Sequence, residues 1–247
     1  DVCSSDLGKR PHLSPLDATP GLLQSLKQEL NSARITCDVI AGYTNLAPGT
    51  AAEVPAIEFQ IAYVESLARI AAELGASIVR IFTAYETDGQ DPQKLWNQTV
   101  TTIREMSDRA AVHGVTLAIQ NHHDLALHTD ALLELLAEID RPNCKLGFDA
   151  WSPALRGENL FEAARKAAPH TALTTNADYI RVPRDRYQPA LVNSERQSPD
   201  WVRAVPFGTG FIDFAAFFKG LRDGGFDGVA VYEMCSPVRG GGTLENL

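Results

Sequence analysis

Three short apolar runs of this chain end in side chains that could do chemistry. Gln120 closes one run, Asp149 closes a second and Glu233 closes a third. A strand buried on both faces is a poor place for an unpaired carboxylate, because burying that charge is costly. Amide and carboxyl groups there can bind polar ligands, and the two carboxylates can also transfer protons. We therefore treat the three positions as one candidate site, with loop solvation as the alternative for each.

The elements that must position these residues alternate along the sequence between apolar strands and helical patterns. This order predicts an α/β protein with a parallel sheet and crossover helices, whose active site lies at the carboxyl ends of the strands. Strands are expected at 35–40, 78–82, 115–120, 145–149, 172–180 and 228–233. Helices are expected at 57–74, 92–110, 129–139, 160–168 and 213–221, and residues 183–206 are expected to form a long loop.

Helix starts carry their own signals. Asp91 and Asp213 each precede a helical pattern and are predicted N-caps, with Pro92 as the first residue of its helix. Thr129 is predicted to cap the helix of 129–139. Residues 8–21 contain three prolines and show no pattern of a helix or strand.

Four further polar residues lie near predicted strand ends. His122 and His123 follow Gln120, and as single loop residues they could equally be solvated or hydrogen-bonded. Arg80 and Arg181 could hold a sugar hydroxyl, a carboxylate or a phosphate, and a structural ion pair is the alternative for each.

Four motifs in a consistent order give the chain a family resemblance between about residues 35 and 233. Leu117–His122 resembles a strand that ends in Glu-Asn-His, and Leu146–Ala150 resembles a Gly-Phe-Asp strand. Val205–Asp213 is similar to a Gly-Glu-Gly-x-Ile-Asp turn, and Gly225–Met234 to a final Gly-Tyr-x-Gly…Tyr-Glu strand. Together they resemble the xylose isomerase-like sugar isomerases and epimerases.

The resemblance implies a (β/α)8 TIM barrel and one divalent metal, Mg²⁺ or Mn²⁺, held by Glu, Asp, His and Glu. By position the ligands here would be Gln120, Asp149 and Glu233, with Thr175 in the place of the histidine. It also implies that Glu233 and His122 are catalytic. Gln120 brings no charge and Thr175 is not an imidazole, so we expect any metal to be held loosely.

Substrate contacts are expected from His123, Arg80 and Arg181. The function implied is a divalent-metal-dependent isomerase or epimerase that moves a proton through an enediol in a small sugar or polyol-like hydroxy-carbonyl substrate. A catalytically weak or inactive barrel that binds a sugar-like ligand is the alternative, favoured by Gln120 and Thr175. A metal-dependent endonuclease of the same fold would need more histidine ligands and a basic face, and the sequence lacks both.

Only six of the eight strands of such a barrel can be found, so we predict an incomplete barrel with the first strands missing. Residues 1–20 are expected to be a non-native or disordered leader, and 21–247 the partial barrel domain.

The bulk composition excludes several kinds of partner. The formal net charge of −9 argues against nucleic acid, and no apolar run is long enough to span a membrane. The four cysteines lack metal-binding spacing, which favours free thiols and a cytoplasmic location. The expected partner is a small carbohydrate, and the sequence leaves open whether the chain forms an oligomer.

Overall fold

A computed structural model describes residues 13–47 and 54–233 of the chain, and its main feature is a six-stranded parallel sheet. The strands run in the order β1-β2-β3-β4-β5-β8. Their bounds are β1 Val39–Ala41, β2 Ile78–Ile81, β3 Thr116–Gln120, β4 Cys144–Gly147, β5 Thr171–Asn176 and β8 Val229–Tyr232. Six parallel strands joined by helices agree with the predicted partial barrel.

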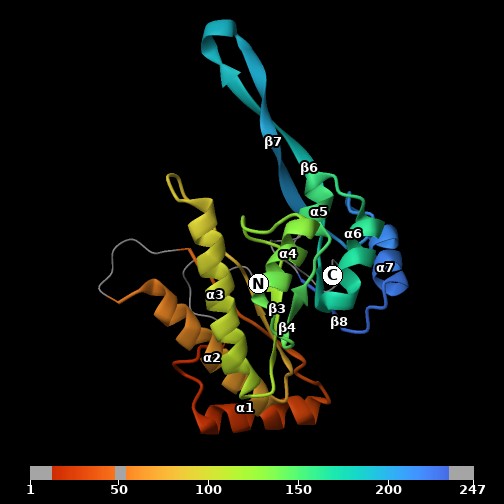
Figure 1. The fold of residues 1–247 in the computed structure, drawn as a ribbon. Coiled ribbons are helices and arrows are strands. Elements are labelled where there is room, and N and C mark those ends of the chain that lie inside the picture. The colour runs from red at the N-terminus through yellow and green to blue at the C-terminus, as the bar shows by residue number, and fades with distance from the viewer. Residues whose placement is uncertain (1–12, 48–53, 234–247) are drawn as a thin grey trace.

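Helices connect consecutive strands of this sheet (Figure 1). The helices are α1 Pro20–Ala33, α2 Ala56–Leu74, α3 Pro92–Ala111, α4 Thr129–Ile139, α5 Trp151–Arg156, α6 Leu160–Ala167 and α7 Phe214–Asp223. Short 3₁₀ turns occupy Ala168–His170 and Pro189–Leu191. The main core includes Val64 and Ala68 of α2 together with Val79 of β2 and Leu117 of β3, all fully buried. Across the described part of the chain, no helix is long and apolar enough to cross a membrane.

The helix caps follow the sequence at two of three predicted positions. Asp91 accepts hydrogen bonds from the first backbone N–H groups of α3, and Asp213 accepts one at the start of α7. The prediction for Thr129 is wrong by one residue. The cap of α4 is His128, whose Nδ1 accepts from the backbone N–H of Asp130, and Thr129 is the first helical residue.

The prediction of a loop at 183–206 is wrong. Strands β6, Asp178–Gln188, and β7, Asn193–Val205, pair antiparallel over this region and form a two-stranded ribbon. Figure 1 shows the ribbon projecting away from the helices and the parallel sheet. Most of its side chains are exposed, so its sequence lacks the alternation of apolar and polar residues that marks a half-buried strand.

The start of the chain differs in detail from what the sequence predicts. The first strand begins at Val39 rather than at residue 35. Helix α1 was not predicted, and its Leu23 packs with Ala18 against Ile70 and Leu74 of α2. Residues 1–12 of the predicted leader lie outside the described residues.

Cys37 and Cys144 are free thiols, as predicted. The other two cysteines, Cys3 and Cys235, lie outside the described residues.

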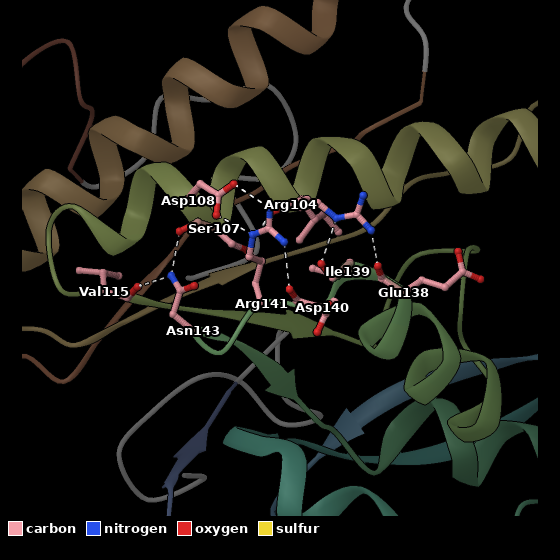
Figure 2. Close-up of polar contacts among 10 residues, drawn as sticks. Arg104, Ser107, Asp108, Val115, Glu138, Ile139, Asp140, Arg141 and Asn143 are labelled. Atoms are coloured by element: carbon pink, nitrogen blue, oxygen red, sulfur yellow. Dashed lines mark hydrogen bonds and ion pairs between the residues drawn. The ribbon is translucent and has the colours of Figure 1, made fainter.

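Polar contacts fix the start of β4, the strand that leads to Asp149 (Figure 2). Arg141 pairs with both carboxylate oxygens of Asp108 on α3, at 2.6 and 3.0 Å. The side-chain amide of Asn143 donates to the backbone oxygens of Ser107, at 2.8 Å, and Val115, at 3.1 Å. The same segment is thereby tied to α3 and to the approach to β3, which holds the two strands in register.

The buried Asp178 holds the turn that leads from the ribbon into α7. Its Oδ2 accepts from the backbone N–H groups of Gly208, at 3.0 Å, and Gly210, at 2.7 Å. A Cβ on Gly210 would lie 2.1 Å from Oδ1 of Asp178 and 2.4 Å from the backbone oxygen of Tyr179. Glycine is therefore required at 210 by close packing.

Candidate functional site

A small cavity lies at the carboxyl ends of β3, β4, β5 and β8. Parallel register brings Gln120 beside Gly147, and Asn176 beside Tyr232, so the residues that end these strands meet at one edge. The cavity is lined by Gln120, His122, Asp149, Trp151, Thr175, Ala177, Tyr179 and Glu233. Its volume is about 10 Å³, enough for roughly one water molecule or one ligand oxygen. The structure thus brings together all three residues predicted to end strands here.

Gln120 is the centre of the hydrogen bonding at this cavity. Its Nε2 donates to Oδ2 of Asp149 at 3.0 Å and to Oγ1 of Thr175 at 2.9 Å. Its Oε1 is buried and has no partner among the described residues. The amide therefore turns its donor toward the carboxylate, so the two groups that resemble metal ligands bond to each other.

Asp149 is held from its backbone as well as its side chain. Its N–H donates to Oδ1 of Asn121 at 2.8 Å, and its backbone oxygen accepts from Nδ2 of Asn121 at 3.1 Å. Oδ1 of Asp149 accepts from the backbone N–H of Ser152 at 3.2 Å. The hydroxyl of Ser152 in turn donates to the backbone oxygen of Asn121. This closed set of contacts leaves the carboxyl group little freedom to move.

Burial raises the pKa of Asp149 from 3.8 to about 7, and the nearby Glu233 acts in the same direction. The hydrogen bonds from Gln120 and from the backbone of Ser152 and Trp151 lower the pKa, but they do not offset the loss of water. A carboxyl group with this pKa exchanges its proton near neutral pH, which is the property of a general acid or base.

Glu233 faces a cation that belongs to the protein. Nη2 of Arg80 lies 3.5 Å from Oε1 of Glu233, and the Arg80 side chain is only 2% exposed. The guanidinium also packs over the ring of Tyr43, at 4.5 Å, and the ring of Phe82, at 4.2 Å. Arg80 therefore contacts the carboxylate at the cavity, although it is not part of the cavity wall itself.

The two predicted histidines lie in different places. The ring of His122 is on the cavity wall and stacks 5.1 Å from that of Trp151. The ring of His123 is buried between Phe82, at 4.4 Å, and Tyr85, at 3.9 Å. Burial first, then the neighbouring His122 and Arg80, lower the pKa of His123 to about 3. His123 stays neutral and does not reach the cavity.

Arg181 also lies away from the cavity. It is an exposed residue of β6, where Nη2 donates to the backbone oxygen of Ala154 at 3.4 Å and the guanidinium packs 4.6 Å from the ring of Phe211. The contacts of Arg181 are those of a residue that fastens the base of the ribbon to α5.

Two aromatic residues of the cavity wall were not predicted. Trp151 and Tyr179 line it, with ring centroids 5.9 Å apart. Trp151 follows Asp149 by two residues, so its place after a strand end was a usable signal. Tyr179 lies within the predicted strand 172–180, which the structure divides between β5 and β6, and nothing in the sequence placed its ring at the cavity.

Residues 4–246 match the sequence model of the xylose isomerase-like TIM barrel family. The chain belongs to this family. A search of curated proteins gave no match.

Solved structures of xylose isomerase-like barrels share the fold. A xylose isomerase domain protein from Planctomyces limnophilus is 22% identical, with a TM-score of 0.67 over 91% of this chain and 79% of that one. A D-allulose 3-epimerase from Methylomonas sp. in complex with D-allulose is 17% identical, with a TM-score of 0.70 over 91% and 72%. A xylose isomerase-like TIM barrel protein from Mycobacterium smegmatis in complex with magnesium is 16% identical, with a TM-score of 0.65 over 88% and 72%. At these identities the likeness is one of fold.

The side chains at the cavity of this xylose isomerase-like barrel do not fit the divalent metal that its sequence motifs imply. In the ranges 13–47 and 54–233, no three His, Cys, Asp or Glu side chains gather closely enough to hold one. Gln120 presents an N–H to Asp149, Thr175 offers a neutral hydroxyl, and Glu233 already faces a guanidinium. Hard divalent cations prefer several charged oxygens, which this set does not supply.

Proposed function

We propose that this chain is an isomerase- or epimerase-type enzyme that acts on a small sugar or a related hydroxy-carbonyl compound. The observation that carries the proposal is the pair of carboxyl groups, Asp149 and Glu233, on one cavity at the carboxyl ends of the strands. Membership of the xylose isomerase-like family and the likeness to a D-allulose 3-epimerase support the same substrate class.

The proposed chemistry is proton transfer next to a carbonyl group. One carboxylate removes the proton from the carbon that bears the hydroxyl, which gives an enediolate with its negative charge on the former carbonyl oxygen. The same carboxyl group can return the proton to the neighbouring carbon while the hydroxyl proton moves to the other oxygen, giving the isomer. Alternatively, the second carboxyl group can protonate the opposite face of the original carbon, giving the epimer. The pKa of about 7 suits Asp149 to either direction of transfer at neutral pH.

The size of the cavity limits how a sugar can bind. Space for roughly one oxygen atom means that the reacting end enters between Asp149 and Glu233 while the rest of the molecule lies outside. The rings of His122, Trp151 and Tyr179 form the wall that this outer part would contact. Aromatic walls with a few placed polar groups are typical of sites for small molecules.

Solvent exchange tests this function directly. The purified chain is mixed in D₂O with a panel of ketoses and aldoses, and proton NMR follows the loss of signal at the carbon next to the carbonyl. Glu233→Gln and Asp149→Asn should each abolish exchange. Glu134→Gln, a change to an exposed carboxylate on α4, is the matched control and should exchange at the wild-type rate.

A ligand-binding barrel without turnover is the second candidate, because Gln120 uses its amide to bond Asp149 and Thr175 instead of offering a carboxylate. Saturation-transfer NMR on the same panel separates the two. Binding without exchange for every sugar would favour the second candidate and reject the first.

A further inference from the structure

Arg80 is an unusual residue for the interior of a barrel. Its side chain is 2% exposed and ends in a positively charged guanidinium. The described residues within reach offer one carboxylate, Glu233 at 3.5 Å, and the faces of Tyr43 and Phe82. A buried charge is costly unless it is paired, so this arrangement needs Glu233 as a carboxylate beside the guanidinium.

Two polar atoms beside this pair are buried and have no partner in the described part of the protein. They are Nη1 of Arg80, a donor, and Oε1 of Gln120, an acceptor. Buried polar groups are nearly always hydrogen-bonded, and each exception needs an explanation. A hydroxyl group of a ligand bound in the cavity, such as a hydroxy-carbonyl compound, would satisfy Oε1 of Gln120, which is on the cavity wall.

Three features therefore weaken this site as a place for a divalent cation: two make its charge more positive, and one removes a ligand without changing the charge. Gln120 stands where the resemblance expects a negative charge, Thr175 stands where it expects an imidazole, and Arg80 places a positive charge against the remaining Glu233. A divalent cation on Glu233 would lie close to the guanidinium and be repelled by it. The side chain of Arg80 is 2% exposed, and its guanidinium packs against the neighbouring rings of Tyr43 and Phe82, which limits its movement.

We propose that Arg80 is the built-in cation of this site, which neutralises and orients Glu233 and takes the electrostatic place of a divalent metal. The inference rests on the proposed function in one respect, that a ligand oxygen binds at this cavity. A guanidinium fixed before the ligand arrives can stabilise negative charge that develops on a carbonyl oxygen. The ligand is then a hydroxy-carbonyl compound held by protein hydrogen-bond donors and not by chelation.

Mn²⁺ binding, measured by electron paramagnetic resonance on the purified full chain, tests the proposal without any need for turnover. Arg80→Gln removes the positive charge and keeps a polar side chain, so it should bind Mn²⁺ at least about tenfold more tightly than the wild type. Arg80→Lys keeps the charge and should bind as weakly as the wild type. A Gln variant that binds no better, or a Lys variant that binds as well as the Gln variant, would overturn the proposal.

The wild type and Glu233→Gln give a second test that needs no change at Arg80. If the proposal holds, the two proteins bind Mn²⁺ equally weakly, because Glu233 is already engaged. Dedicated sites for hard cations bind with dissociation constants of about 10 µM or tighter. The proposal is rejected if the wild type binds one Mn²⁺ this tightly and Glu233→Gln loses that binding. Failure of the exchange assay with every sugar leaves these metal titrations unaffected, so the two proposals can fail separately.

Discussion

Asp149→Asn should make the protein more stable above neutral pH and change its stability much less in acid. Asp149 is 4% exposed, and its pKa in the folded protein is about 7 against an ordinary value of 3.8. Between these two values the folded protein binds a proton that the unfolded chain has released. Stability is therefore lost as the pH rises from about 4 to about 7, and the cost is complete above that range.

The size of the effect follows from the difference between the folded and unfolded pKa values of Asp149. A difference of one between the two pKa values corresponds to about 1.4 kcal/mol of unfolding free energy. The buried carboxyl group therefore lowers the free energy of unfolding by about 4 kcal/mol at pH 8 and by about 1 kcal/mol at pH 4.5. Asparagine is neutral at both. The free energy of unfolding of Asp149→Asn relative to the wild type should therefore rise by about 3 kcal/mol between pH 4.5 and pH 8.

The local geometry can accept the amide. Rotation of the Gln120 side-chain amide by half a turn would direct its unpartnered Oε1 toward the Nδ2 of the new asparagine, and the hydroxyl of Thr175 can then donate. The side-chain oxygen of the asparagine keeps the hydrogen bond from the backbone of Ser152. The number of unpaired groups stays the same, because the rotation pairs Oε1 of Gln120 and leaves its Nε2 without a partner instead.

Urea unfolding of both proteins at pH 4.5, 6, 7 and 8 measures this difference. Asp227→Asn, which removes the same charge from an exposed position, is the matched control. A difference between Asp149→Asn and the wild type that is constant over the whole pH range would refute the reasoning. So would a variant that is less stable than the wild type at pH 8.

Three further predictions, two on variants and one on the unchanged protein, concern the cavity and its surroundings. Gln120→Glu should tighten Mn²⁺ binding, because it adds a charged oxygen beside Asp149; an unchanged affinity by electron paramagnetic resonance would mean that this cavity is no metal site even when recharged. The ring of His123 should remain neutral at pH 5 in nitrogen-15 NMR spectra, since burial lowers its pKa to about 3, with the exposed His170 as reference in the same sample; a protonated ring would contradict the burial. Gly210→Ala should lower the free energy of unfolding by roughly 2 kcal/mol, because the new Cβ overlaps Asp178; an unchanged urea midpoint would disprove the close packing.

The sequence predicted the convergence of Gln120, Asp149 and Glu233 because the carboxyl ends of parallel strands share one edge. It could not predict the contact between Arg80 and Glu233, which are 153 residues apart and are brought together only by the curvature of the open sheet. Placing both histidines at the site overlooked that neighbouring residues can face different surroundings: His122 lines the cavity and His123 is buried between two rings.

The ribbon escaped prediction for a related reason. Most side chains of its strands are exposed, and burial is confined to the base of the ribbon at Asp178, Tyr179, Ala204 and Val205, so residues 183–206 show little apolar alternation. Backbone hydrogen bonds pair β6 with β7, and every residue except proline carries both groups needed for them, so this pairing leaves little trace in the sequence.

The ribbon lets the length of the chain between β5 and β8 vary without disturbing the parallel sheet. Those two strands are neighbours in the sheet, and the ribbon leaves and returns on one side of it. Closing such an excursion costs entropy that grows only with the logarithm of its length, about 0.6 kcal/mol for each doubling. The far end of the ribbon, at Pro189–Leu191, is thus a natural place to insert a fluorescent or affinity module. Such an insertion should leave the geometry of the cavity at Glu233 unchanged.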